Sequence, residues 1–346
     1  MMREPSPAST ADGRVAVPWP WRIARPALIS LAAVLVLGAA ALIRLDMPRT
    51  ALIAKYAGPK ARFVPLPDGT VVHVRLEGPR DKPTVVLLHG EMNSLQSWDS
   101  WAQRLSENYR VVSIDEPGHG LTGPTVAGDY SRAGMVSFLH AVFGRLNVRR
   151  AAIVGHSMGG GVAAEYAERY PNEVWALVLV DASGIPRTGP RSGLDAMAQH
   201  ALLRPVLRWS LPRWMIGAGI RKRVGDRSKV TDEMIDRIYD LVHFPGNRAA
   251  LIGRYLAPSD DAAVEAGLTS LAVPTLIEWG GSDPVLPLSS AREFQRLIRD
   301  ARLVVYPGVG HLVPEELPEQ SERDAAAFLA QVQPSSGSPQ GQSRQE

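Results

Sequence analysis

The chain has 346 residues, of which 45% are hydrophobic and 21% are charged, and 38 basic against 35 acidic residues leave a net charge of +3. This composition predicts a globular protein with one large domain and an insertion, and it carries no nucleic-acid-binding signature. Cysteine is absent, which excludes disulfides, thiolate chemistry and cysteine-ligated metals.

The N-terminal region begins with residues 1–26, a stretch rich in Pro, Ser and Ala that is typical of a disordered tail. The 17 residues that follow, Ala27–Ile43, carry no charge. A helix needs roughly 17–25 such residues to cross a bilayer. Trp21 and Arg25 before the run and Arg44 after it are typical interfacial anchors. The pattern predicts a single-pass membrane anchor, with the rest of the chain extracytoplasmic, which is the periplasm in a bacterium.

A cleaved signal peptide is the main alternative, because Ala39-Ala40-Ala41 offers small residues for cleavage. However, Leu42 and Ile43 continue the apolar run past that site, and the preceding segment is long for such a peptide. A buried core helix is disfavoured because the run is apolar all round. At the other end of the chain, residues 333–346 are polar and of low complexity, and we expect a disordered tail without chemistry.

The body of the chain alternates short apolar runs with helical patterns. Arg62–Pro67 and Thr70–Leu76 flank Asp68-Gly69, which predicts a hairpin. Six further predicted strands are Thr84–Leu88, Arg110–Ile114, Ala151–Val154, Val174–Val180, Thr275–Trp279 and Arg302–Tyr306. Most are apolar throughout, as in strands covered on both faces. The pattern indicates an α/β protein with a mostly parallel eight-stranded sheet and helices on both faces.

One long segment, residues 185–271, contains only helical patterns, including a helix start with capping chemistry at Thr231-Asp232-Glu233. We expect this insertion to form a helical cap over the edge of the sheet, between core segments 61–184 and 272–332. Surface helices packed elsewhere are the alternative.

A candidate nucleophile lies directly after the strand Ala151–Val154, in Val-Gly-His-Ser-Met-Gly-Gly. A strand that turns sharply into a helix leaves no room for side chains around the bend. Gly155 and Gly159 would supply that clearance, with Ser157 exposed at the apex in a strained conformation. Taken alone, the motif also fits an ordinary glycine-rich loop.

A serine nucleophile needs a base and an acid that orients the base. His311 follows the last predicted strand in a glycine-containing loop, and Asp283 follows the strand Thr275–Trp279. The order Ser157, Asp283, His311 is the one that this architecture uses. Asp181, at the end of the strand Val174–Val180, is a rival for the acid.

The oxyanion of the reaction needs two backbone donors. The amide of Met158, at the start of the helix after the turn, is one candidate. The other is the amide of Glu91 in His89-Gly90-Glu91-Met92, which follows the strand Thr84–Leu88. The side chain of Glu91 would bring a carboxylate near a developing negative charge unless it turns away.

The remaining histidines have no assigned chemistry. We expect His156 to point away from Ser157, and His89 and His119 to be structural because they lie in glycine turns. No motif surrounds His73, His140, His200 or His243.

Five segments, in order and at matching spacing over residues 61–332, together resemble the α/β-hydrolase family. They are LLHGEMNSLQSW (Leu87–Trp98), DEPGHGLT (Asp115–Thr122), VGHSMGG (Val154–Gly160), WGGSDPVLP (Trp279–Pro287) and GVGHLVPEELPE (Gly308–Glu319). The resemblance implies Ser157 as nucleophile, Asp283 as acid, His311 as base and the amides of Glu91 and Met158 as oxyanion donors. It implies no metal and no organic cofactor.

Departures from the family limit the choice of reaction. His-Gly-Glu resembles the same loop of haloalkane dehalogenases, but those enzymes and the epoxide hydrolases use an aspartate where Ser157 stands. C–C bond hydrolases usually have a glycine-rich oxyanion loop, which Glu91–Ser94 lacks. We expect a hydrolase of carboxylic esters with small or medium apolar acyl groups. A C–C bond hydrolase, a cofactor-free haloperoxidase and a catalytically silent membrane-tethered binding protein are the alternatives.

Basic and aromatic residues mix in the predicted cap. They are Arg204, Arg208, Trp209, Arg213, Trp214, Met215, Arg221, Lys222, Arg223, Arg227 and Lys229. Such a surface could contact anionic lipid, and a solvated basic face is the alternative. The expected partners are therefore a small-molecule ester and a membrane, and no nucleic acid.

Overall fold

The computed structural model describes residues 24, 26–30, 38, 43–186, 193–258 and 260–334. The chain divides into two units, residues 1–43 and 44–346. Most of the predicted anchor, Ala27–Ile43, lies outside the described residues, as do most of both predicted tails, so these stay predictions. Among the described residues, no helix has the length and apolar character needed to cross a membrane.

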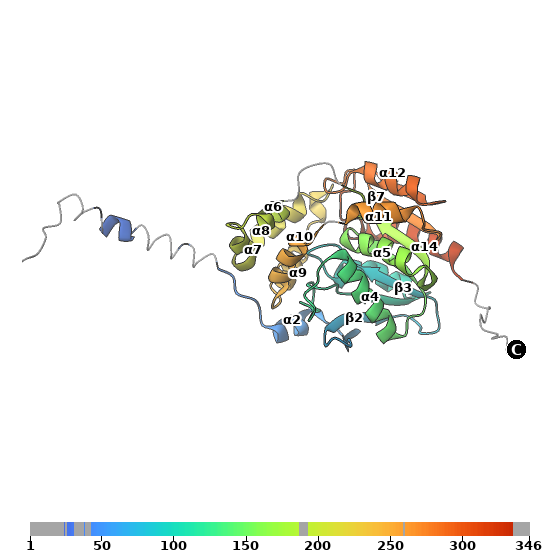
Figure 1. The fold of residues 1–346 in the computed structure, drawn as a ribbon, viewed down its shortest axis with the longest axis horizontal. Coiled ribbons are helices and arrows are strands. Elements are labelled where there is room, and N and C mark those ends of the chain that lie inside the picture. Colours follow the sequence, from blue (N-terminus) through green and yellow to red (C-terminus); the bar gives the residue numbers. More distant parts are fainter. Residues whose placement is uncertain are drawn as a thin grey trace, which may run out of the picture. The chain divides into compact units, whose positions relative to one another are not determined.

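The second unit is built on one eight-stranded sheet, in the order β1-β2-β4-β3-β5-β6-β7-β8 (Figure 1). The strands are β1 (Ala61–Pro65), β2 (Val71–Glu77), β3 (Thr84–Leu88), β4 (Arg110–Ile114), β5 (Ala151–His156), β6 (Val174–Val180), β7 (Thr275–Gly280) and β8 (Arg302–Tyr306). β2 is antiparallel to both of its neighbours, and all other pairs are parallel. The predicted sheet is confirmed, with β5 and β7 extending slightly further toward the site than predicted.

Both faces of the sheet are covered because successive residues of a strand point to opposite sides. In β3, Val86 and Leu88 join the core cluster that includes α4 and α5, whereas Val85 and Leu87 join the cluster that includes α3 and α14. The helices and 3₁₀ turns outside the insertion are α2 (Arg49–Tyr56), η1 (Leu95–Trp98), α3 (Asp99–Leu105), α4 (Arg132–Leu146), α5 (Met158–Arg169), η2 (Pro171–Glu173), α12 (Leu288–Leu297), α13 (Val313–Glu316) and α14 (Pro318–Val332).

The insertion between β6 and β7 is helical in its described part. It holds α6 (Gly193–Gln199), α7 (Arg204–Trp209), α8 (Arg213–Arg221), η3 (Arg227–Lys229), α9 (Asp232–Val242), α10 (Asn247–Leu256) and α11 (Asp261–Leu268). Helices α6–α10 gather beside the sheet, whereas α11 lies next to α5 (Figure 1). Val264 and Leu268 of α11 pack into the core of the sheet. We therefore use "cap" for residues 193–256, which have a separate apolar core that Met92 and Leu312 join.

Candidate active site

Ser157 lies at the sharp turn between β5 and α5. Its backbone has φ 51° and ψ −113°, in the left-handed region that is strained for a residue with a side chain. Its amide donates to the carbonyl of Val180 (2.9 Å), and its carbonyl accepts from the amide of Ser183 (2.9 Å). These bonds to β6 and to the residues after it hold the strained turn in place.

The two glycines of the motif are required by close backbone approaches. A Cβ atom at Gly155 would lie 2.3 Å from the carbonyl oxygen of Gly159, and one at Gly159 would lie 2.6 Å from that of Leu88. Neither backbone oxygen can move aside without breaking the turn. The clearance expected from the sequence is therefore present.

The side chains of Ser157, Asp283 and His311 form one continuous set of hydrogen bonds. His311 Nε2 lies 2.9 Å from Ser157 Oγ, and His311 Nδ1 lies 2.7 Å from Asp283 Oδ2. Because a carboxylate only accepts, Nδ1 carries the proton, and Nε2 accepts from the serine hydroxyl. Asp283 Oδ1 in turn accepts the amides of Val285 (2.6 Å) and Leu286 (3.0 Å). The imidazole is thus fixed in the tautomer that a general base needs.

The rival acid, Asp181, has a different environment. Its Oδ1 accepts the amide of Gly280 (2.8 Å), and its Oδ2 accepts that of Val313 (3.4 Å). Burial, followed by the nearby charge of Asp283, raises its pKa well above the ordinary value. Asp181 therefore ties β7 to the start of α13, and the carboxylate bonded to His311 is that of Asp283.

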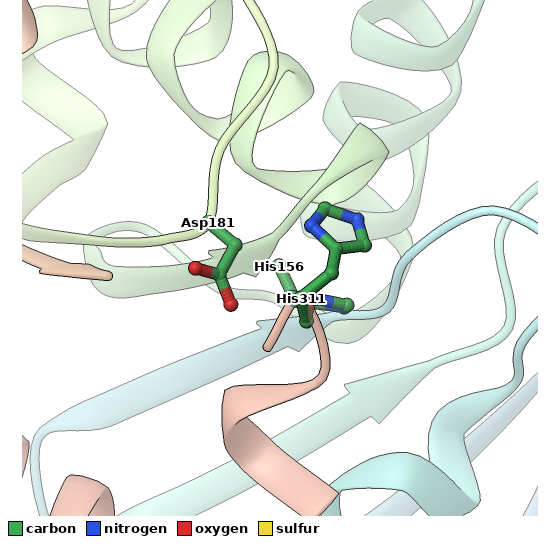
Figure 2. Close-up of side chains that lie close together, drawn as sticks. All are labelled: His156, Asp181 and His311. Carbon is green, nitrogen blue, oxygen red and sulfur yellow. Dashed lines mark hydrogen bonds between the residues drawn. The ribbon is translucent and has the colours of Figure 1, made fainter. Parts of the chain in front are cut away.

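Figure 2 shows His156, Asp181 and His311 close together, and their potential ligand atoms lie within 4.8 Å of one another. This set could in principle hold a metal ion. However, both ring nitrogens of His311 are already engaged by Ser157 and Asp283, and both oxygens of Asp181 accept backbone amides. The hydrogen bonds account for the cluster, and the set does not fit a metal site.

His156 has a role that the sequence did not indicate. Its Nε2 donates to the carbonyl of His311 (2.7 Å), so its hydrogen bond goes to the backbone of His311 rather than to Ser157. Burial, assisted by the proximity of His311, lowers the pKa of His156 to about 3. It is therefore neutral and acts as a fixed donor that positions the loop of His311. Its place directly before the nucleophile was the available signal.

The predicted oxyanion donors lie on two elements next to Ser157. Within the described part of the chain, neither the amide of Glu91 nor that of Met158 donates a hydrogen bond. Met158 begins the 12-residue helix α5, whose N-terminus favours negative charge. A Cβ atom at Gly90 would lie 2.6 Å from His156 Nδ1 and 3.3 Å from Ser157 Cβ. Glycine at this position lets the loop of Glu91 pass directly beside the nucleophile.

Two adjacent glutamates of α13 connect the cap to the site. Glu315 accepts from Nδ2 of Asn93 (2.7 Å), which lies in the loop of the predicted oxyanion donor Glu91, and forms an ion pair with Arg237 of α9. Glu316 accepts the amides of Gly225 (3.0 Å), Asp226 (2.9 Å) and Gly310 (3.1 Å). No local sequence pattern predicts these contacts, because they join segments that lie far apart along the chain.

The amide of His311 also bonds to the segment after α8, through the carbonyl of Arg223 (2.7 Å). The loop of His311 and segment 223–226 are therefore held together by this backbone hydrogen bond and by the shared contacts with Glu316.

The other histidines lie outside this set of hydrogen bonds. His89 is fully buried and accepts the amide of Glu116 at Nε2 (3.1 Å). His119 bonds to the carbonyl of Pro117, and burial lowers its pKa to about 3. His73 pairs with Asp115 (2.6 Å) in the core, His140 stacks on Tyr170, His243 bonds to the carbonyl of Tyr239, and His200 is exposed.

A cavity of about 1380 Å³ adjoins the triad, and both Ser157 and His311 line it. Most of its apolar lining comes from the cap, including Leu211, Met215, Ile216 and Ile220. Its polar lining includes Glu91, Asp195, Arg223 and Arg254. A molecule with both an apolar and a polar part would fit such a lining.

Comparisons with known proteins identify the fold family. The family model of the alpha/beta hydrolase fold matches residues 83–218 and 239–318. Monoacylglycerol lipase ABHD6 of Rattus norvegicus is 29% identical over 262 residues, which cover 73% of this chain and 77% of the lipase.

Two solved structures extend the comparison. Lip1 from Acinetobacter baumannii AYE, a candidate lipase, superposes with a TM-score of 0.70 at 25% identity, covering 84% of this chain and 98% of its own. The meta-cleavage product hydrolase CumD from Pseudomonas fluorescens IP01 superposes with a TM-score of 0.67 at 26% identity. The superposition covers 78% of this chain and 97% of CumD.

Proposed function

The chain belongs to the α/β-hydrolase fold family, and on that premise we propose that it is a serine hydrolase that cleaves carboxylic esters of small or medium apolar acyl groups. One observation carries the proposal. The His311 imidazole bonds to Ser157 on one side and to Asp283 on the other, beside a cavity with a largely apolar cap lining. The similarity to a monoacylglycerol lipase supports an ester as the substrate.

The reaction would follow the geometry of the triad. Ser157 Oγ attacks the ester carbonyl as its proton passes to His311 Nε2, and Asp283 stabilises the imidazolium. The oxyanion accepts from the amides of Glu91 and Met158. His311 returns the proton to the leaving alcohol, which leaves an acyl group on Ser157. Water, deprotonated by His311, then releases the acid and restores the serine.

A C–C bond hydrolase is the second candidate, because CumD is similar over nearly its whole length. The same triad would act on a vinylogous diketone. Turnover of such a compound at rates above those for esters would favour this function over ester hydrolysis.

A fluorophosphonate probe tests the proposal directly, since only an activated serine reacts with it. We expect labelling of the wild type and of Ser183→Ala, a matched change at another serine that lines the cavity. Ser157→Ala should not label, and its turnover of p-nitrophenyl esters should fall by about 10⁴-fold or more. A folded wild type that does not label would instead indicate a silent binding protein.

We further propose that residues 27–43 anchor the chain in a membrane, with the hydrolase unit extracytoplasmic and the cap against the lipid. The segment after the run is held on the cap, because Arg44 donates its amide to the carbonyl of Trp209 (2.6 Å) and Asp46 pairs with Arg248 (2.7 Å). Trp209 and Trp214 are 45% and 69% exposed. Exposed tryptophans of this kind are typical of surfaces that contact lipid headgroups.

Two basic residues of the cap differ in how closely acidic partners neutralise them. Arg208 stacks on Trp209 at 4.4 Å, which places a cation beside an exposed aromatic ring, and its acidic partner Asp46 lies at 4.0 Å. Arg213 is paired more closely with Asp232 (2.9 Å) and Asp236 (2.5 Å), so its charge is neutralised locally. The tryptophans and Arg208 are therefore the residues to test.

A further inference from the structure

Four polar side chains that line the cavity each have a buried atom with no hydrogen-bond partner among the described residues: Glu91, Arg132, Ser183 and Arg254. Arg132 forms an ion pair with Asp260 (2.8 Å), which leaves Glu91 and Arg254 as the two other charged groups of this set. Glu91 Oε1 and Arg254 Nε are both inaccessible to solvent, and neither has a hydrogen-bond partner among the residues that the structure describes. Both residues line the cavity that contains Ser157. Buried polar atoms are usually paired in folded proteins, so unpaired atoms of charged side chains that line a cavity are candidates to bond a ligand group.

The two side chains lie within electrostatic reach of each other. Burial raises the pKa of the Glu91 carboxyl, and the guanidinium of Arg254 is the largest influence in the opposite direction. A carboxyl with a raised pKa retains its proton more readily, so it can donate as well as accept a hydrogen bond. A protonated Glu91 side chain also carries no negative charge that would repel an oxyanion bound at the backbone amide of the same residue.

Glu91 lies close to the position that the reacting ester would occupy. The side chain belongs to the loop that passes beside Ser157 at Gly90. The apolar lining from α8, including Ile216 and Ile220, suits the acyl chain. The polar pair then suits the alcohol part of the ester.

We propose that Glu91 and Arg254 form a subsite for the hydroxyl groups of a polyol leaving group. The preferred substrate is then a monoester of a small polyol such as glycerol with an apolar acid. A hydroxyl of the polyol donates to Glu91 Oε1, and a hydroxyl oxygen accepts from the Nε–H of Arg254. This inference rests on the proposed ester hydrolysis and specifies its substrate class.

The test compares two esters that share one acyl chain, glyceryl monooctanoate and ethyl octanoate, on the full-length protein. We expect the wild type to prefer the glyceryl ester in kcat/KM. Glu91→Leu and Arg254→Met should each lower the ratio of kcat/KM for the glyceryl ester to kcat/KM for the ethyl ester about tenfold. Glu91→Gln, which can still donate and accept, should retain most of the preference.

Matched controls are Glu233→Leu and Arg227→Met, which change exposed residues of the same types in the insertion. Both should keep the wild-type preference. Fluorophosphonate labelling of every variant shows whether the triad is intact, and Arg254→Met tests the subsite from a second element if Glu91→Leu fails to fold.

Three results would overturn the inference. A wild type that labels but hydrolyses both esters equally removes the subsite and leaves the proposed function standing. Variants that lose both esters in parallel would show that Glu91 and Arg254 support the oxyanion loop rather than the alcohol. A wild type that neither labels nor hydrolyses either ester overturns the proposed function and the subsite together.

Discussion

Acid should destabilise this protein in a way that can be traced to His156. The folded-state pKa of this histidine is lowered to about 3 by burial, whereas an unfolded histidine titrates near 6.5. Above pH 6.5 the residue is neutral in both states and carries no penalty. Between pH 6.5 and 3 the unfolded chain binds a proton that the folded chain refuses, so the free energy of unfolding falls as the pH falls.

The size of the effect follows from the two pKa values. From pH 7 to pH 4.5, His156 alone should remove about 2–3 kcal/mol from the free energy of unfolding. His156→Gln removes the titrating group, and its amide can still donate to the carbonyl of His311. The variant is expected to be less stable than the wild type at pH 7 by about 1 kcal/mol, because the ring no longer fills its site. Its loss between pH 7 and pH 4.5 should nevertheless be smaller by the amount given above.

Urea unfolding at the two pH values measures this difference, followed by the fluorescence of tryptophans such as the buried Trp98 and Trp101. His200→Gln is the matched control, because His200 is exposed, and it should keep the wild-type pH dependence. Equal losses in the wild type and in His156→Gln would refute the assignment of a buried neutral histidine. The pH profile of kcat/KM above pH 5 should be the same in both proteins, since His156 does not titrate there.

Three further predictions concern the residues around the site. Asp283→Asn should lower kcat by about 10⁴-fold, whereas Asp181→Asn should lower it far less, because Asp181 bonds to backbone amides and not to His311; ester kinetics compare the two. Glu316→Gln replaces one acceptor oxygen by an amino group that faces backbone amides, so it should lower both the melting temperature and kcat, with a smaller change in KM. An unchanged kcat would show that Glu316 does not position the loop of His311. In a chain that starts at Arg44, the double substitution Trp209→Ala and Trp214→Ala should reduce flotation with anionic liposomes. If the unmutated chain from Arg44 does not float with these liposomes, the proposed contact between the cap and lipid is wrong.

Much of the sheet and the placement of the triad residues were predictable because their signals are local. The apolar runs of β3 and β6 have the lengths of buried strands, and glycines flank Ser157 at the positions that the turn requires. The residues Asp283 and His311 could be assigned because each follows a strand, and parallel strands end at one edge of the sheet. That these side chains would meet could be predicted because they follow parallel strands in the chain order typical of this fold.

The rest of the site depends on contacts that leave no local pattern. His156 donates to a backbone carbonyl 155 positions away, and any residue could supply that carbonyl. Glu315 and Glu316 look like ordinary surface acids at the start of a helix. The packing of α11 on the sheet instead of the cap could not be read from its sequence, because an amphipathic helix suits either partner.

The contacts of the cap indicate that it helps to position the loop of His311, the proposed base, in addition to covering the cavity. Segment 223–226 accepts the amide of His311 and donates two amides to Glu316, which also holds Gly310. Moving that segment away from the sheet would break these bonds and release the loop that carries the base. Ile216 and Ile220 of α8 line the cavity, and the segment bonded to His311 and Glu316 follows α8 directly. We therefore expect substitutions at the end of α8 to change substrate preference and kcat together.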